Sequence, residues 1–384
     1  MPNKLRELAQ GEELYTSWII AWADDVGGNV SKQYNAHKNF YVTHGNLPGH
    51  LLQKEFHVHF ASTSPHASTA EQAKALREMV NQSHENPVRA YNAATGHTCR
   101  FHMVVPILPA DNPQQSEESS HIGPNGNCKC RKCKCGGGAH FMESDEGFHF
   151  LHFPGEPRTT ADTLKEIMNQ IDLAAEGRAD PVKKQQTGSG IKDKVTQGWI
   201  VKMLQKHKSI RIAEPELSSA DIKVQVLEWL YSCTEEPWNP LLTFKGKSCF
   251  TMLINECLWL LIGLDPHCDT PVELLHTILL GIVKYVWHNV NQIWSDFDRA
   301  NFVLRLQSAD ISGMNIPPIQ ASYMVQYRNS LIGKQFRVLM QLMLFNIHGL
   351  IDEPRYTLIK EVGRLGALLW FPEIYNLEEY LVCY

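Results

Sequence analysis

The chain has 384 residues, of which 43% are hydrophobic and 20% are charged, and its formal net charge is −5. This length accommodates two or more domains with their own cores, and the composition is ordinary for a soluble globular protein. The acidic balance argues against nucleic-acid binding through overall charge, although a local basic face remains compatible with it.

Three features indicate a nuclear or cytoplasmic protein that is not secreted. Residues 1–10 are polar and do not resemble a signal peptide. The apolar runs 252–264 and 274–287 are short and carry charged or histidine residues, so we expect buried helices and no membrane partner. Six of the ten cysteines are scattered and fit no disulfide framework, which favours a reducing compartment: Cys99, Cys233, Cys249, Cys257, Cys268 and Cys383.

The first 120 residues have the pattern of an α/β domain. Apolar or alternating runs predict strands at 14–23, 40–43, 56–61 and 99–108. A helix is predicted at 69–82, after Ser64-Pro65, because apolar residues recur there at helical spacing. The predicted order is therefore three strands, a helix and a further strand.

Carboxylates follow the first and last of these predicted strands. Asp24 and Asp25 come after the first strand, and Asp111 comes after the last. If the two strands are neighbours, these carboxylates can share Mg²⁺, which prefers oxygen ligands and leaves positions open for phosphate. That arrangement is the one used by RNase H-like nucleases and transposases. The alternative is that all three aspartates only cap turns.

Four further cysteines lie within eight residues: Cys128, Cys130, Cys133 and Cys135. The spacing of Cys130 and Cys133, with glycines nearby, is typical of a zinc knuckle. Four such closely spaced thiolates are expected to strain a single tetrahedral site. We therefore expect a structural Zn²⁺ that pairs some of the cysteines with ligands further on, the candidates being His140, His149 and His152.

Other interpretations of the cysteine block remain open. They are adventitious or cuprous metal binding, a redox switch, and the absence of any metal. Basic residues within the block, including Arg131 and Lys132, favour thiolates and are also candidates for contact with phosphate.

The remainder of the chain is predicted to be helical. A helix is expected to begin at Thr160 and to stop at Gly177, whereas the polar segment 178–191 has the composition of a linker. Further helices are predicted at these ranges: 192–206, 219–232, 250–262, 277–290, 319–350 (or two helices joined at Gly333) and 356–369.

Two groups of residues in this helical part are functional candidates. Asp269 is predicted to cap a helix, with Pro271 in the first turn; Glu273 and His276 share a face that is suited to metal or phosphate. Three basic residues are candidates for nucleic-acid contact: Arg328, Lys334 and Arg337. The alternatives are that His276 is a core histidine with its hydrogen bonds satisfied, and that the three basic residues lie on a solvated helix face.

Five ordered blocks together resemble transposon-derived proteins of basidiomycete fungi. They read DDVGGNVSKQYN at 24–35, FASTSPH at 60–66, ADNP at 110–113 with SSH at 119–121, CRKC at 130–133, and DTPVELLHT at 269–277 with LLGIVK at 279–284. The last block looks like the Asp…His segment of CACTA (En/Spm-type) transposases, which are related to fungal KDZ elements.

This resemblance implies a DDE transposase that cuts and joins DNA with two Mg²⁺ ions. It implies that Asp24 or Asp25 is the first carboxylate, that Asp111 is the second, and that Asp269 and His276 are a signature pair of a helical insertion. The expected class is α+β, with a partial RNase H-like core at 1–122, a zinc knuckle at 123–158 and an all-α insertion-type domain at 159–384.

The chain also departs from the family. The spacing between Asp269 and His276 is longer than in the plant elements, and the third carboxylate of the family is expected beyond Tyr384. We therefore expect a catalytically impaired protein that retains DNA binding, with a second copy or a fuller-length transposase as partner. One alternative is a zinc-stabilised helical interaction module without nucleic-acid chemistry. Another is an active nuclease that receives its missing carboxylate from a partner chain.

Overall fold

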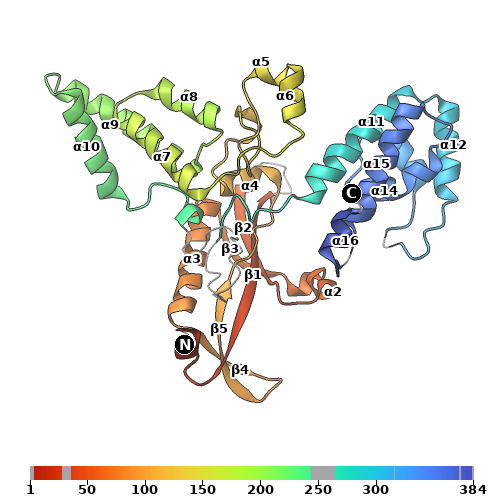
Figure 1. The fold of residues 1–384 in the computed structure, drawn as a ribbon, viewed down its shortest axis with the longest axis horizontal. Coiled ribbons are helices and arrows are strands. Elements are labelled where there is room, and N and C mark those ends of the chain that lie inside the picture. The colour runs from red at the N-terminus through yellow and green to blue at the C-terminus, as the bar shows by residue number, and fades with distance from the viewer. Residues whose placement is uncertain (1–3, 28–35, 244–263, 315, 372, 383–384) are drawn as a thin grey trace. The chain divides into compact units, whose positions relative to one another are not determined.

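The computed structural model describes residues 4–27, 36–243, 264–314, 316–371 and 373–382. The chain divides into two compact units, Met1–Pro271 and Val272–Tyr384. The first unit contains a five-stranded sheet followed by helices, and helices are the regular elements of the second (Figure 1). The predicted α+β class is confirmed, and the division falls inside the region that was expected to be one helical domain.

The strands of the first unit are β1 (Glu13–Gly27), β2 (Ala36–His44), β3 (His59–Ser64), β4 (Val88–Asn92) and β5 (His97–Val104). Their order across the sheet is β3-β2-β1-β5-β4. The pairs β1–β2, β2–β3 and β4–β5 are antiparallel, whereas β1 and β5 are parallel. The parallel pair brings the first and last predicted strands side by side.

The helical segments of the first unit precede, connect and follow these strands, and the helices within 160–233 lie away from the sheet (Figure 1). They are α1 (Lys4–Ala9), α2 (Gly49–Leu52), η1 (Glu55–His57), α3 (Thr69–Glu85), α4 (Asn112–Glu118), η2 (Gly123–Asn125), α5 (Ala139–Met142), α6 (Asp145–Phe150), α7 (Thr160–Ala175), α8 (Ala179–Ser189), α9 (Lys194–Ala213), α10 (Ser219–Cys233) and η3 (Pro240–Thr243).

One face of the sheet packs against α3. Alternate residues of β1 point to the same side because side chains along a strand alternate between faces. Ile19, Ala21 and Ala23 are accordingly buried against Ala73 and Val80 of α3. On the opposite face, Trp22, Tyr41 and Phe60 form an aromatic row across β1, β2 and β3, with ring centroids 5.8 and 5.9 Å apart.

A second core in this unit is formed by α7, α8, α9 and α10. It is built from fully buried apolar side chains, including Ile171, Met203 and Val226. Gly177, which follows α7, has a φ of +76°, the left-handed conformation in which glycine commonly ends helices.

The second unit has its own core. Its helices are η4 (Leu275–Val283, a π-helix), α11 (Lys284–Ile293), α12 (Asp296–Gln307), α13 (Ala321–Gln326), α14 (Gly333–Asn346), α15 (Glu353–Leu369) and α16 (Leu377–Val382). Trp287, Phe302 and Phe336 are the largest side chains buried at its centre. Within the described ranges, no helix is both long and apolar enough to cross a membrane.

Several predicted elements differ from the structure. The predicted linker at 178–191 is wrong, because it forms α8, and its Gly-Ser-Gly sequence supplies the C-cap of that helix, Gly190 with φ +75°. The short strand β4 was not predicted. Residues 319–350 form two helices, as the alternative predicted, and the second begins at Gly333 after the intervening residues 327–332. The predicted helix at 250–262 lies outside the described residues.

Candidate functional site

The first candidate carboxylates lie on the part of β1 that extends beyond its pairing with β5. The last parallel pair joins Trp18 to Val104. Asp24 and Asp25 are exposed and follow Trp18 by six and seven residues, on opposite faces of the strand. Asp25 forms an ion pair of 2.8 Å with Lys38, which is its register partner on β2.

The second candidate carboxylate, Asp111, is the N-cap of α4. It follows Val104 by seven residues, so both candidate positions lie beyond the same end of the parallel pair. The Oδ1 atom of Asp111 accepts a hydrogen bond of 2.8 Å from the backbone N–H of Gln114. The capping alternative considered for Asp111 is therefore present in the structure, where it satisfies an otherwise unpaired N–H group of the helix.

Asp269 lies next to the connection that carries Asp111. Its carbonyl accepts a hydrogen bond from Leu108 N–H at 2.9 Å, and Gln115 of α4 donates to the carbonyl of Pro271 at 2.7 Å. The prediction that Asp269 caps a helix is wrong, because its side chain instead accepts from Asp265 N–H at 2.8 Å within a turn. The fold thus places the segment 265–271 against Leu108 and Gln115, which flank the second candidate carboxylate in sequence.

His276 belongs to the second unit and has a local partner. Its ring Nδ1 and its backbone N–H lie 3.1 and 2.7 Å from Oε2 of Glu273. Glu273 and His276 do share a face, and the carboxylate caps the start of the helical turn.

A buried carboxylate at the opposite end of α4 from Asp111 was not predicted from the sequence. Glu118, at the end of α4, is 4% exposed, and its Oε2 atom has no hydrogen-bond partner. Burial raises the pKa of Glu118 to about 8, which the hydrogen bond from Gln114 only partly offsets. Glu118 belongs to a run of Gln, Ser and Glu residues at 114–120, in which no local signal marks one residue as buried.

The four clustered cysteines lie in one closed loop and are free thiols. A β-bridge pairs Cys128 with Gly136, and another pairs Cys133 with Pro157. Gly136 has a φ of +139°, and a Cβ atom there would lie 2.1 Å from the carbonyl oxygen of Asn127, so this closure requires glycine.

The thiols of this cysteine loop influence one another electrostatically. Burial raises the pKa of Cys135, and the charges of Cys133, Cys130 and Cys128 raise it further. Burial also raises the pKa of Cys130, but hydrogen bonds from the backbone N–H groups of Lys132 and Cys133 outweigh it and leave this pKa lowered. The sulfurs of Cys128 and Cys135 lie 3.6 and 3.7 Å from the carbonyl oxygens of Gly188 and Phe150.

The histidines predicted as additional ligands are exposed on and after α5 and α6. The rings of His149 and His152 contact the ring of Phe148, with centroids 5.6 and 5.0 Å apart. Across the described parts of the chain, no three His, Cys, Asp or Glu side chains are grouped so that they could hold a metal ion. This applies to the cysteine loop and to the candidate Mg²⁺ carboxylates alike.

Three buried basic or imidazole side chains, which were not predicted, fasten the cysteine loop. Arg158 is 4% exposed, and its Nε donates to the carbonyls of Cys130 and Cys133 at 2.9 and 3.2 Å. His121 Nε2 lies 2.8 Å from the carbonyl of Cys128, and His267 Nδ1 lies 2.9 Å from that of Arg131. The loop is therefore tied to the segment 265–271 as well as to α4.

The basic residues proposed to contact nucleic acid differ in what they touch. Arg131 donates to Asn112 and Gln115 side chains, and Lys132 donates to the carbonyl of Cys268, so both are engaged within the protein. In the second unit, the guanidinium of Arg337 lies 5.3 Å from the ring centre of Trp370. Lys334 is exposed and Arg328 is partly exposed.

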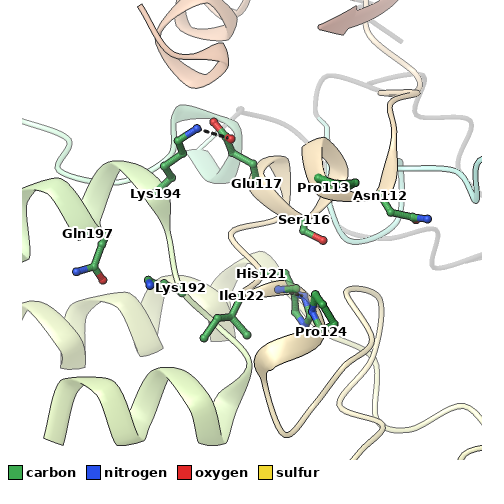
Figure 2. Close-up of a pocket in the computed structure, with 11 residues that line it drawn as sticks. Asn112, Pro113, Ser116, Glu117, His121, Ile122, Pro124, Lys192, Lys194 and Gln197 are labelled. Atoms are coloured by element: carbon green, nitrogen blue, oxygen red, sulfur yellow. Dashed lines mark hydrogen bonds and ion pairs between the residues drawn. The ribbon is translucent and has the colours of Figure 1, made fainter. Parts of the chain in front are cut away.

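A pocket of about 650 Å³ lies between α4 and the beginning of α9 (Figure 2). Pro113, Ile122 and Pro124 supply apolar parts of its lining, and Lys192 and Lys194 add positive charge. Lys194 is paired with Glu117 at 2.7 Å, as the dashed line in Figure 2 marks. Asn112, which lines this pocket, is the residue that follows Asp111 in the sequence.

No protein-family model matches the chain, and no curated protein matches it.

Proposed function

We propose that the chain is a transposon-derived, DDE transposase-like protein that binds DNA through divalent cations and is impaired in DNA cleavage. The observation that carries this proposal is the parallel pairing of β1 with β5. It puts the candidate first carboxylates, Asp24 and Asp25, and the second, Asp111, beyond the same end of two neighbouring strands.

The strand order supports an RNase H-like core. Such a core has three antiparallel strands, then a helix, then a strand that returns parallel to the first. The order β3-β2-β1-β5, with α3 between β3 and β5, has this arrangement. The antiparallel hairpin of β4 with β5 departs from it. The segment that contains Asp269 adds support, because the carbonyl of Asp269 accepts a hydrogen bond from Leu108, three residues before Asp111.

The divalent cation accounts for DNA binding by an acidic chain. With a net charge of −5, the protein repels phosphate at long range. Mg²⁺ held by aspartate oxygens reverses the local charge and keeps coordination positions free for phosphate oxygens. Both candidate ligands already have a local partner, Lys38 for Asp25 and the N–H of Gln114 for Asp111, so Mg²⁺ has to compete with these contacts and we propose that cleavage is impaired. A fuller-length transposase is the proposed partner.

The test of this function is duplex DNA binding with Mg²⁺ and with EDTA, measured by fluorescence anisotropy at several salt concentrations. We expect binding that requires Mg²⁺ and weakens steeply as salt rises. Asp111→Asn is the informative variant, because asparagine also caps helices and removes only the charge that attracts the metal. Binding that is unchanged in Asp111→Asn, or insensitive to EDTA, refutes the proposal.

A structural Zn²⁺ in the cysteine loop is part of the same proposal. Thiolates are common zinc ligands, but the four thiols are not grouped for a metal ion in the described structure, so zinc binding would require them to turn towards one point. Bound zinc would supply rigidity here and would take no part in the reaction. It would hold the loop between α4, which Asp111 caps, and the segment 265–271, which is hydrogen-bonded to Leu108 and Gln115.

One observation favours a second candidate function, a helical interaction module. In the second unit, an apolar pocket lies between α12 and α13 and is lined partly by Val303, Leu304 and Val325. Leu304 is 67% exposed beside this pocket, so apolar surface is accessible to a partner there. Absence of any DNA binding in the experiment above, at low salt and with Mg²⁺, favours this second function.

A further inference from the structure

The pocket between α4 and the beginning of α9 is formed by two segments that are hydrogen-bonded to each other. The N–H of Lys192 donates to the carbonyl of Ser120, and the N–H of Ile122 donates to the carbonyl of Gly190, each at 2.9 Å. The hydroxyl of Ser120 also donates to Asp193, the N-cap of α9, at 2.8 Å. These bonds fix both walls without using the groups that face the cavity, so the pocket is formed before any ligand binds.

Most of the surface that lines this pocket is apolar. Pro113, Ile122 and Pro124 supply it, as Figure 2 shows. His121 adds an uncharged ring, because burial lowers its pKa to about 4. Both ring nitrogens of His121 lie within hydrogen-bond distance of backbone groups, at 2.8 and 3.0 Å, which fixes the ring in the wall. A cavity of about 650 Å³ with such a lining suits the apolar body of a small organic molecule.

One positive charge in the lining is not compensated by the protein. Lys194 is paired with Glu117 at 2.7 Å. Lys192 is exposed at the pocket and forms no ion pair with Asp or Glu among the described residues. Because His121 is neutral, the two lysines and the glutamate leave the pocket with a net charge of +1. A ligand with a single negative charge balances it.

Two further polar groups of the lining are hydrogen-bond donors that the described residues leave unused. One is the hydroxyl of Ser116. The other is the amide NH₂ of Gln197, whose oxygen accepts from Gln186 at 2.8 Å. These donors and the ammonium of Lys192 favour an anion that only accepts hydrogen bonds. A carboxylate has this property and carries one charge, whereas a phosphate monoester carries between about −1.5 and −2 at neutral pH.

We propose that this pocket binds a small organic monocarboxylate, with its apolar body against Pro113, Ile122 and Pro124 and its carboxylate at Lys192. Ser116 and the residues of α9 complete the carboxylate end. This inference goes beyond the proposed function, because the ligand is neither DNA nor a metal ion. None of the candidate Mg²⁺ ligands lines the pocket.

The experiment uses the full chain without DNA or Mg²⁺, and 1-naphthoate as the probe in ligand-observed saturation-transfer NMR. The control probe is 1-naphthalenemethanol, which has the same apolar body and no charge. We expect 1-naphthoate to bind with a Kd of about 1 mM or below, as its size allows, and the control probe to bind about tenfold more weakly. Inorganic phosphate at the concentration of the probe is expected not to displace it, since phosphate lacks the apolar body.

Variants of Lys192 and Ser116 locate the site. Lys192→Met is expected to weaken binding of 1-naphthoate by about 5- to 10-fold, because water partly screens an exposed lysine, and to leave the neutral probe unaffected. Lys192→Arg should bind like the wild type. Lys183→Met is the matched control, because Lys183 is an exposed lysine of α8 outside the pocket. Ser116→Phe fills the cavity and should abolish binding of both probes, with circular dichroism as the check that the variant is folded.

The Lys192 variants keep the inference testable if Ser116→Phe does not fold, because Lys192 is exposed and its replacement leaves the core intact. Equal binding of the two probes, unchanged affinity in Lys192→Met, displacement by phosphate, or no binding of 1-naphthoate to the wild type would each overturn the inference. None of these results bears on the Asp111→Asn test, whose failure overturns the DNA proposal alone.

Discussion

Replacement of Glu118 by glutamine is predicted to stabilise the protein, and to do so more strongly as pH rises. In the folded protein this carboxyl has a pKa of about 8 instead of its ordinary value of 4.5, because it is buried. The unfolded chain therefore loses the proton near pH 4.5 while the folded chain keeps it until about pH 8. Between these values the unfolded state binds fewer protons, so the stability of the wild type falls as pH rises.

The size of the effect follows from the same two values. Each pKa unit corresponds to about 1.4 kcal/mol, so at pH 7 the 2.5 units above the ordinary pKa correspond to about 3 kcal/mol. Glutamine has the shape of the protonated acid and no charge to bury. We expect Glu118→Gln and the wild type to have similar free energies of unfolding near pH 4.5. At pH 7 the variant is expected to be more stable by about 3 kcal/mol, with the full difference reached above pH 8.

The assay is urea denaturation of both proteins at pH 5, 6, 7 and 8, followed by circular dichroism. Glu143→Gln is the control, because Glu143 is exposed and its replacement should leave the pH dependence as it is in the wild type. A difference between Glu118→Gln and the wild type that stays constant with pH contradicts this account, and so does a destabilised variant at pH 8.

Three further predictions concern stability. Asp111→Ala removes a helix cap and should cost about 1 kcal/mol, whereas Asp111→Asn should retain most of the cap; equal losses in thermal unfolding would argue against the capping role. Arg77→Met breaks a largely buried ion pair of 2.8 Å with Glu236 and should cost about 3 kcal/mol in urea denaturation, and a loss below about 1 kcal/mol would contradict this. Gly177→Ala should cost at least about 1 kcal/mol in the same assay, because the added Cβ meets the ring of His207 at 2.6 Å and φ is positive; an unchanged midpoint would show that the helix end adjusts.

The sequence predicted elements well where a local rule decides the structure. The strand at 14–23, the helix beginning at Thr160 and its stop at Gly177 follow from alternation, capping and glycine chemistry, and the structure contains all three. The prediction of a linker at 178–191 failed because Gly-Ser-Gly is common both to flexible linkers and to helix C-caps. The strand β4 has only five residues and lies at the sheet edge, so its pattern was too short to recognise.

The candidate site was only partly predictable, for a different reason. The sequence marked Asp24, Asp25, Asp111 and the cysteines by residue type and spacing. The burial of Glu118 and the bonds from Arg158 to the cysteine carbonyls depend on residues distant in sequence. In the sequence, Arg158 cannot be distinguished from a surface arginine, because its burial depends on the cysteine loop that folds over it. The surroundings of the cysteines could therefore be described only once the fold was known.

The central claim is that aspartates beyond the β1–β5 pair bind a divalent cation that holds DNA. The most direct measurement is the affinity for a labelled DNA duplex with and without Mg²⁺, compared between the wild type and Asp111→Asn. We predict that Mg²⁺ strengthens binding by the wild type at least about tenfold, or about 1.4 kcal/mol, and has little effect on the variant. Equal responses of the two proteins to Mg²⁺, or no binding by either, would contradict the claim.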